Sequence, residues 1–147
     1  MHEFPHHYPV TASASDTSNV DVTSPGLATL DTAPPAEFDG PGDVWSPETL
    51  LVASVANCLI LTFRAIARAS RLEWNSLRCD VVGELDKVDR VTQFTGFELK
   101  AHLEVPAGTD PGRAERLLHK AEQGCLITNS LKADSHLAAE VTVAASD

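Results

Sequence analysis

Apolar and polar positions alternate with the period of β-strands in the first part of the chain. Residues 8–15 alternate throughout, and two shorter segments, 19–24 and 27–32, are separated by a Pro-Gly turn signal. This pattern predicts a small antiparallel meander. The proline- and glycine-rich residues 33–45 exclude regular structure and predict a loop, which either connects two elements or covers a pocket.

A long apolar segment with helical start signals follows this loop. Ser46 is a suitable N-cap, Pro47 suits the first helical position, and Glu48 suits the positive end of the helix dipole. These signals predict a helix over about residues 47–70. Its first half is apolar nearly all round, which predicts burial on most sides, and its second half is amphipathic.

Two longer segments, residues 76–86 and 94–105, alternate apolar side chains with polar ones. They predict a hairpin with one face in the core and one face in solvent. The predicted solvated face carries Arg78, Asp80, Glu84, Glu98, Lys100, His102 and Glu104.

The last third of the chain repeats the helix signals. Asp110 can cap a helix that starts at Pro111, and Gly124 can end it. A short helical turn can then begin at Cys125, and residues 136–144 predict a final strand. The predicted order is β-β-β-α-β-β-α-(α)-β, which is an α+β pattern.

The length and charge of the chain limit the classes of protein to which it can belong. The 147 residues predict a single domain over residues 1–147, with residues 1–7 as a flexible N-terminus. The net charge is −10, and residues 1–63 contain eight acidic residues but no Lys or Arg, which argues against nucleic-acid and anionic-membrane partners. The uncharged apolar run 50–63 is too short to span a bilayer, and the first ten residues do not resemble a signal peptide. A cytoplasmic location is therefore predicted.

Three cysteines, an odd number, do not predict a disulfide framework. There is no CxxC pair and no Cys/His spacing typical of zinc, so no metal site is predicted. Cys79 alternates in register with Leu77 and Val81, as core filler does. Cys125 follows a helix-ending glycine, where free N–H groups can stabilise a thiolate, although composition alone favours a structural role.

Cys58 lies in the middle of the predicted apolar helix, about twelve residues from its start. The helix dipole gives it little help there, and apolar burial disfavours the thiolate, so the helix alone indicates core filler. Glu48 lies ten residues earlier, about 15 Å along a straight helix axis. Glu48 could therefore serve this thiol only from another chain or through bound groups.

Two motifs taken together resemble the OsmC/Ohr family, the osmotically inducible and organic hydroperoxide resistance proteins. "SPETLLVASVANC" is followed, 67 residues after its cysteine, by the cysteine of "GCLITNSLK", and the loop "DGPGDVW" before the helix also fits. The family positions are Pro47, Glu48, Leu50, Cys58, Cys125, Thr128, Asn129 and Leu131. The match covers nearly the whole chain, from Tyr8 to Val143.

The resemblance implies an OsmC-like α+β fold, in which antiparallel strands wrap around the long central helices of an intertwined homodimer. It implies two sites at the subunit interface, where Glu48 can approach the other subunit's thiol. It also implies peroxidase chemistry on organic hydroperoxides: Cys58 becomes a sulfenic acid, and Cys125 condenses with it to a disulfide. An external dithiol of the lipoyl type resets the pair, and no metal or organic cofactor takes part.

The sequence departs from the family at one position. Family peroxidases carry an arginine between the first two strands, and the corresponding stretch here, about residues 16–24, has no Arg or Lys. Arg64 points elsewhere on the helix, and His6 and His7 are the nearest alternatives in sequence. Two rival readings follow: other thiol redox or sensing chemistry, and a non-catalytic dimer that binds an apolar small molecule and keeps the cysteines as relics.

Overall fold

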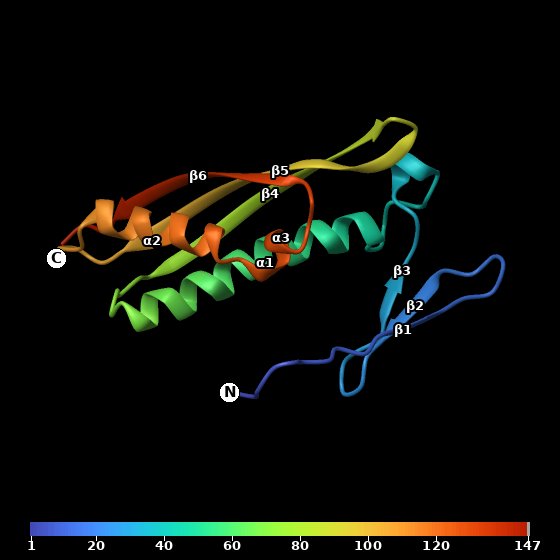
Figure 1. Ribbon diagram of the computed structural model, residues 1–147, viewed down its shortest axis with the longest axis horizontal. Helices are drawn as coiled ribbons and strands as arrows, with labels where there is room; N and C mark the ends of the chain where they lie inside the picture. The colour runs from blue at the N-terminus through green and yellow to red at the C-terminus, as the bar shows by residue number, and fades with distance from the viewer. Residues whose placement is uncertain (147) are drawn as a thin grey trace. The chain divides into compact units, whose positions relative to one another are not determined.

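The computed structural model describes residues 1–146 (Figure 1). Its contacts divide the chain into two compact units, Met1–Leu51 and a second unit that begins at Val52, and each is described by itself. The element order is three strands, a 3₁₀ turn, a long helix, two strands, two helices and a last strand. This order confirms the predicted α+β pattern, and the single-domain expectation stays a prediction.

The first unit contains the expected meander. Strands β1 (Thr11–Ser13), β2 (Val20–Thr23) and β3 (Leu30–Thr32) pair antiparallel in the order β1-β2-β3. Gly26 has a φ of 78°, which glycine adopts without strain, in the turn between β2 and β3. β1 is shorter than the alternating segment 8–15 that predicted it. All three of its residues are exposed, so burial of side chains does not stabilise a longer strand.

The loop after β3 corrects one expectation, because it contains a turn of regular structure. Residues Ala36–Phe38 form a 3₁₀ turn, η1, and the N–H of Phe38 donates to the carbonyl of Pro35 at 2.9 Å. Gly40 closes the turn against the backbone of Pro34, since a Cβ at Gly40 would lie 1.7 Å from the Pro34 oxygen. Proline fixes the entry and glycine allows the close approach, so the breakers shape this turn.

Helix α1 (Pro47–Ala69) begins and ends within one residue of the prediction. Ser46 and Thr49 cap it reciprocally: the Thr49 N–H donates to Ser46 Oγ (3.1 Å), and the Ser46 N–H donates to Thr49 Oγ1 (2.9 Å). By length and composition alone, α1 could cross a membrane, which the shorter uncharged run did not indicate. The absence of a membrane partner stays a prediction.

The first half of α1, which was expected to be buried on most sides, is buried at Val55 and half-buried at most of its other residues in the single chain. One stripe is fully buried, while Leu61 on the opposite side is half exposed. The buried stripe is Val55, Leu59, Phe63 and Ala67. On the N-terminal side of this stripe, α1 packs closely against strand β4. A Cβ at Gly83 of β4 would lie 2.8 Å from the Val52 side chain of α1. The described chain therefore buries one stripe of α1 fully and covers the other residues of the helix in part or not at all.

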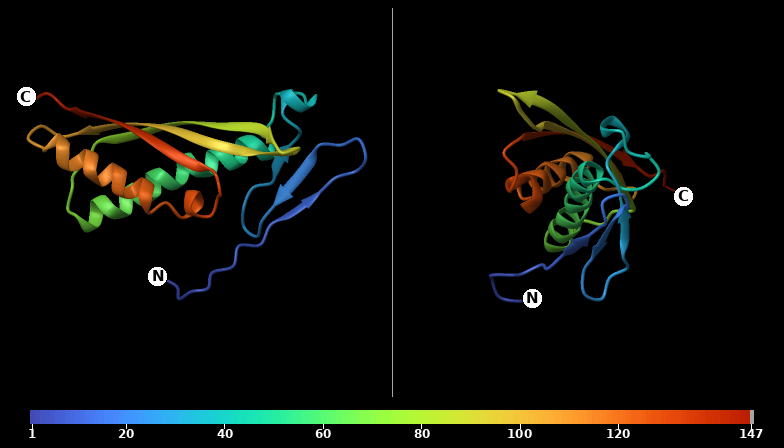
Figure 2. Two further views of the ribbon diagram at one scale, coloured as in Figure 1. Left: turned by 45° about the horizontal axis from the view of Figure 1, so that its top comes forward. Right: turned by 90° about the vertical axis from the view of Figure 1, so that its right-hand side faces the viewer.

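The second unit is a three-stranded sheet with helices on one face (Figures 1 and 2). β4 (Ser76–Val88) pairs antiparallel with β5 (Val91–Val105), and β5 pairs in parallel with β6 (Asp134–Val143). The crossover between β5 and β6 holds α2 (Pro111–Gln123) and α3 (Leu126–Asn129). The inner face of β5 is buried at Phe97, Leu99, Ala101, Leu103 and Val105.

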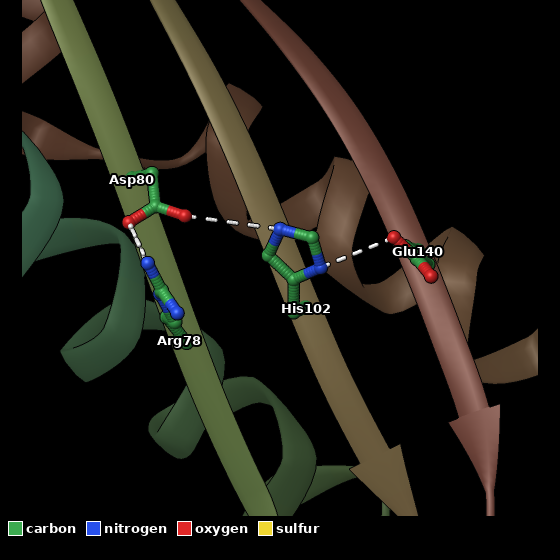
Figure 3. Close-up of polar contacts among 4 residues, drawn as sticks. All are labelled: Arg78, Asp80, His102 and Glu140. Atoms are coloured by element: carbon green, nitrogen blue, oxygen red, sulfur yellow. Dashed lines mark hydrogen bonds and ion pairs between the residues drawn. The ribbon is translucent and has the colours of Figure 1, made fainter.

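The outer face of the sheet is polar, as predicted, and carries a row of ion pairs across three strands (Figure 3). Asp80 contacts Arg78 at 3.1 Å and His102 Nε2 at 3.8 Å, and His102 Nδ1 contacts Glu140 at 3.1 Å. These side chains are all more than 40% exposed, and exposed pairs of this kind contribute about 0–1 kcal/mol to stability.

Candidate functional site

The structure brings Cys58 and Cys125 together, although 67 residues separate them in sequence. Cys58 lies midway along α1 and is half-buried, and Cys125 is the N-cap of α3 and is 1% exposed. The two side chains form a hydrogen bond, and both cysteines are free thiols. Two of the three predicted site residues therefore form one site.

The junction between α2 and α3 holds Cys125 in place. Its backbone is extended (φ −68°, ψ 112°), and its N–H donates to the carbonyl of Glu122 at 3.2 Å. Its own carbonyl accepts from the Asn129 N–H at 3.0 Å and from the Thr128 hydroxyl at 3.2 Å. Gly124 thus closes α2 and Cys125 opens α3, as the Gly-Cys order predicted.

The sulfur of Cys58 is surrounded by hydrogen-bond donors. One is the Cys125 thiol, and two are the backbone N–H groups of Leu126 and Ile127. The fourth is the hydroxyl of Thr62, one helical turn along α1, with Oγ1 3.7 Å from Sγ. All four donors are neutral.

The pKa values of the two thiols move in opposite directions. Burial acts to raise the pKa of Cys58, but hydrogen bonds from Cys125, Ile127, Thr62 and Leu126 together outweigh it, so the pKa lies below its ordinary value. Burial raises the pKa of Cys125, and its hydrogen bond to Cys58 raises it further. Cys58 is therefore the more acidic thiol of the pair, and Cys125 donates the hydrogen bond between them.

Cys79 differs from both. It lies opposite Ala101 in the β4–β5 pair, and burial, aided by the negative charge of Asp80, raises the pKa of Cys79 to about 11. A thiol with that pKa is protonated at neutral pH and reacts poorly as a nucleophile. This state agrees with the space-filling role expected of it.

Glu48 lies in the first turn of α1, as predicted from the capping signals. Its Oε1 is buried and has no hydrogen-bond partner among residues 1–146. α1 runs without interruption from Glu48 to Cys58, so ten residues correspond to about 15 Å along a straight axis. Glu48 does not reach this thiol along the helix that carries both residues.

Sequence reasoning missed several groups of the site. Thr62 was noted only as a polar interruption of an apolar helix, although a residue four positions after Cys58 shares its face. Glu122, at the end of α2, has a buried Oε2 without a partner in the described chain, and burial raises its pKa. Glu122 lines a cavity of about 350 Å³ together with Thr128 and Asp134. Within residues 1–146, no group of three or more His, Cys, Asp or Glu residues could hold a metal ion.

Comparison with known proteins identifies the family. Residues 40–140 match the family of OsmC-like proteins, and this range includes Glu48 and both cysteines of the pair. The chain belongs to the OsmC-like family. This confirms the resemblance that the two cysteine motifs indicated.

Individual similar proteins cover nearly the whole chain. An uncharacterized protein of Bacillus subtilis (strain 168), YmaD, is 26% identical over 142 residues, covering 94% of this chain and 95% of that protein. The structure of an organic hydroperoxide resistance protein OsmC from Legionella pneumophila is 25% identical with a TM-score of 0.76, covering 96% of this chain and all of that one. An OsmC-like protein of unknown function from Vibrio cholerae gives a TM-score of 0.79 at 21% identity, covering 95% of this chain and all of that one.

Proposed function

We propose that this OsmC-like protein is a thiol-dependent peroxidase that reduces organic hydroperoxides through Cys58 and Cys125. The observation that carries the proposal is the hydrogen-bonded pair of free thiols, one with a lowered pKa and one with a raised pKa. A lowered pKa supplies a nucleophile, and a protonated neighbour is ready to resolve the oxidised sulfur. The name of the Legionella pneumophila relative adds support from the family.

Within the protein, the proposed reaction needs only these two thiols. The Cys58 thiolate attacks the terminal oxygen of the hydroperoxide, the O–O bond breaks, and the alkoxide takes a proton and leaves as the alcohol. Cys58 is then a sulfenic acid. The Cys125 sulfur attacks it, water leaves, and a Cys58–Cys125 disulfide forms. A dithiol of the lipoyl class reduces this disulfide by two exchange steps and is itself oxidised.

Glu48 and a second subunit complete the proposal. An intertwined homodimer gives Glu48 a route to the thiol of the other subunit, which the helix spacing denies it within one chain. The buried Glu48 oxygen without a partner and the half-exposed Leu61 on α1 support a second copy that covers them. The net charge of −10 supports a protein without nucleic-acid or anionic-membrane partners, and we propose that it acts in the cytoplasm.

Disulfide mapping tests the proposal. Reduced protein is treated with one equivalent of cumene hydroperoxide and quenched by alkylation, and its disulfides are mapped by mass spectrometry. A Cys58–Cys125 link within seconds is expected, together with loss of hydroperoxide consumption in Cys58→Ser and retention in the matched control Cys79→Ser. Thiols that stay free for minutes would contradict the peroxidase and favour a module that binds an apolar small molecule.

Turnover separates an enzyme from a sensor. Dihydrolipoamide supplied in excess is expected to sustain consumption of many equivalents of cumene hydroperoxide. A rapid single disulfide with no turnover by any dithiol would instead indicate redox sensing at the same cysteine pair.

A further inference from the structure

The surroundings of Cys58 raise a question of charge. A buried thiol normally needs a nearby cation to ionise, and residues 1–63 contain no Lys or Arg. The pKa of Cys58 is set by burial, which raises it, and by four hydrogen bonds, which lower it. None of the four hydrogen-bond donors carries a charge. Neutral hydrogen-bond donors therefore lower the pKa of Cys58, as a nearby cation usually does for a buried thiol.

Thr62 is the side chain on α1 itself that faces this sulfur. Its Oγ1 lies 3.7 Å from the Cys58 Sγ, and its methyl carbon would lie 3.9 Å from a Cβ at Gly124. The methyl group thus faces the segment that carries Cys125, while the hydroxyl faces Cys58. A β-branched side chain has few rotamers, so this packing fixes the direction of the hydroxyl. Because a thiolate only accepts hydrogen bonds, the Thr62 hydroxyl donates to it.

Two backbone groups complete the set of donors. The N–H groups of Leu126 and Ile127 belong to the first turn of α3, where N–H groups have no partner within the helix. Hydrogen bonds from both N–H groups lower the pKa of Cys58. The segment that delivers the Cys125 thiol therefore also delivers two donors to its partner.

We propose that Thr62 is a positioning residue for the Cys58 nucleophile, and that its hydroxyl and the N–H groups of Leu126 and Ile127 take the place of a cation. The inference rests on the proposed function, in which Cys58 reacts as a thiolate. Cys58 is then reactive only while residues 124–127 hold their place against α1.

The substitutions Thr62→Val and Thr62→Ser test this inference. Valine keeps the shape and removes the hydroxyl, and serine keeps the hydroxyl and removes the methyl group. The rate of Cys58 alkylation by iodoacetamide is measured against pH in reduced protein, by mass spectrometry of the Cys58 peptide. In Thr62→Val, the midpoint of the curve of alkylation rate against pH is expected to rise by about one pH unit. Below this midpoint alkylation should be about tenfold slower than in wild type, while the rate at the high-pH plateau should be unchanged. Thr62→Ser is expected to stay near wild type.

The substitution Leu126→Pro tests the backbone donors. Proline lacks the N–H, is tolerated at the first helical position, and follows a residue whose backbone is already extended. The Leu126 side chain is 66% exposed, so little packing is lost, and Leu126→Ala is the matched control. The midpoint is expected to rise in Leu126→Pro, by less than in Thr62→Val, and to stay in place in Leu126→Ala.

The outcomes separate this inference from the proposed function, because alkylation uses no peroxide. A shifted midpoint in Thr62→Val supports the inference even if the protein never consumes hydroperoxide. An unchanged midpoint, or a lowered plateau at an unchanged midpoint, overturns the inference even if the wild-type protein is an active peroxidase.

Discussion

Two clusters of polar groups lie on opposite sides of the same sheet, and they differ in charge and in burial. The outer cluster joins four exposed polar side chains, Arg78, Asp80, His102 and Glu140 (Figure 3). The inner cluster is built around Cys58 from neutral donors and includes a cysteine that is 1% exposed. In the inner cluster, hydrogen bonds outweigh burial and lower the pKa of Cys58.

The difference teaches that solvent access, more than the number of charges, decides what a cluster can do. Water screens the outer pairs and competes for every hydrogen bond. In the inner cluster, water competes less, so a few neutral donors can overcome the cost of burying a thiolate. Substitutions on the two sides of the sheet should therefore differ in the size of their effect.

Cys125→Ala is expected to have the largest effect. It removes both the resolving thiol and a hydrogen-bond donor to Cys58, so steady-state reduction of cumene hydroperoxide should fall by at least about a hundredfold. A single oxidation of Cys58 to the sulfenic acid should survive, and dimedone labelling with mass spectrometry detects it. Undiminished multiple turnover would show that Cys125 is not the resolving cysteine.

Cys79→Ala is expected to change how stability depends on pH. The pKa of Cys79 is raised from 9.0 to about 11, so its contribution is complete below pH 9.0 and is lost as pH rises through 11. The free energy of unfolding should therefore fall by about 2 kcal/mol more in wild type than in the variant over this interval. Urea unfolding at about pH 8 and about pH 11.5 measures both proteins. Equal losses would mean that Cys79 is not shielded from solvent.

Glu122→Gln is expected to stabilise the protein at neutral pH. Burial raises the pKa of Glu122 above 4.5, so the stability that it contributes is present below pH 4.5 and is lost as pH rises through the folded-state pKa. The amide removes a carboxylate whose buried Oε2 has no hydrogen-bond partner among residues 1–146, and the gain at pH 7 should be about 1 kcal/mol, with none at about pH 4. Urea unfolding at both pH values measures it, and a loss at pH 7 would show that the carboxylate has a partner.

Asp80→Asn is expected to have the smallest effect. It breaks both contacts of Asp80 on the outer face, yet the free energy of unfolding should change by less than about 0.5 kcal/mol. The alkylation profile of Cys58 should coincide with that of wild type. A shift of that profile would show that charges on the outer face act through the sheet, and the contrast between the two clusters would fail.

Local signals predicted most of the elements. Ser46 and Pro47 at α1, and Asp110, Pro111 and Gly124 at α2, mark helix ends through interactions within a few residues, so the pattern alone locates them. Features that depend on contacts between distant parts of the chain were not predicted. No pattern in residues 134–143 shows that β6 pairs in parallel with β5, and apolarity all round α1 did not reveal that one chain fully buries a single stripe.

The candidate site was predicted in part, and for a different reason. The pairing of Cys58 with Cys125 came from resemblance to a family, because no local rule links positions 67 residues apart. The donors to Cys58 could not be predicted in this way. Thr62 looks like an ordinary polar residue in a helix, and the N–H groups of Leu126 and Ile127 leave no mark in the sequence.

The sequence distance between the paired thiols has a consequence for heat resistance. A bond between Cys58 and Cys125 ties α1 to α3 and closes a loop of 67 residues in the unfolded chain. Closing a loop of that size stabilises the native state by about 4 kcal/mol in the chain-entropy treatment. The oxidised protein should then melt several degrees above the reduced protein. A thermal melt would therefore report the redox state of the pair without any chemical label.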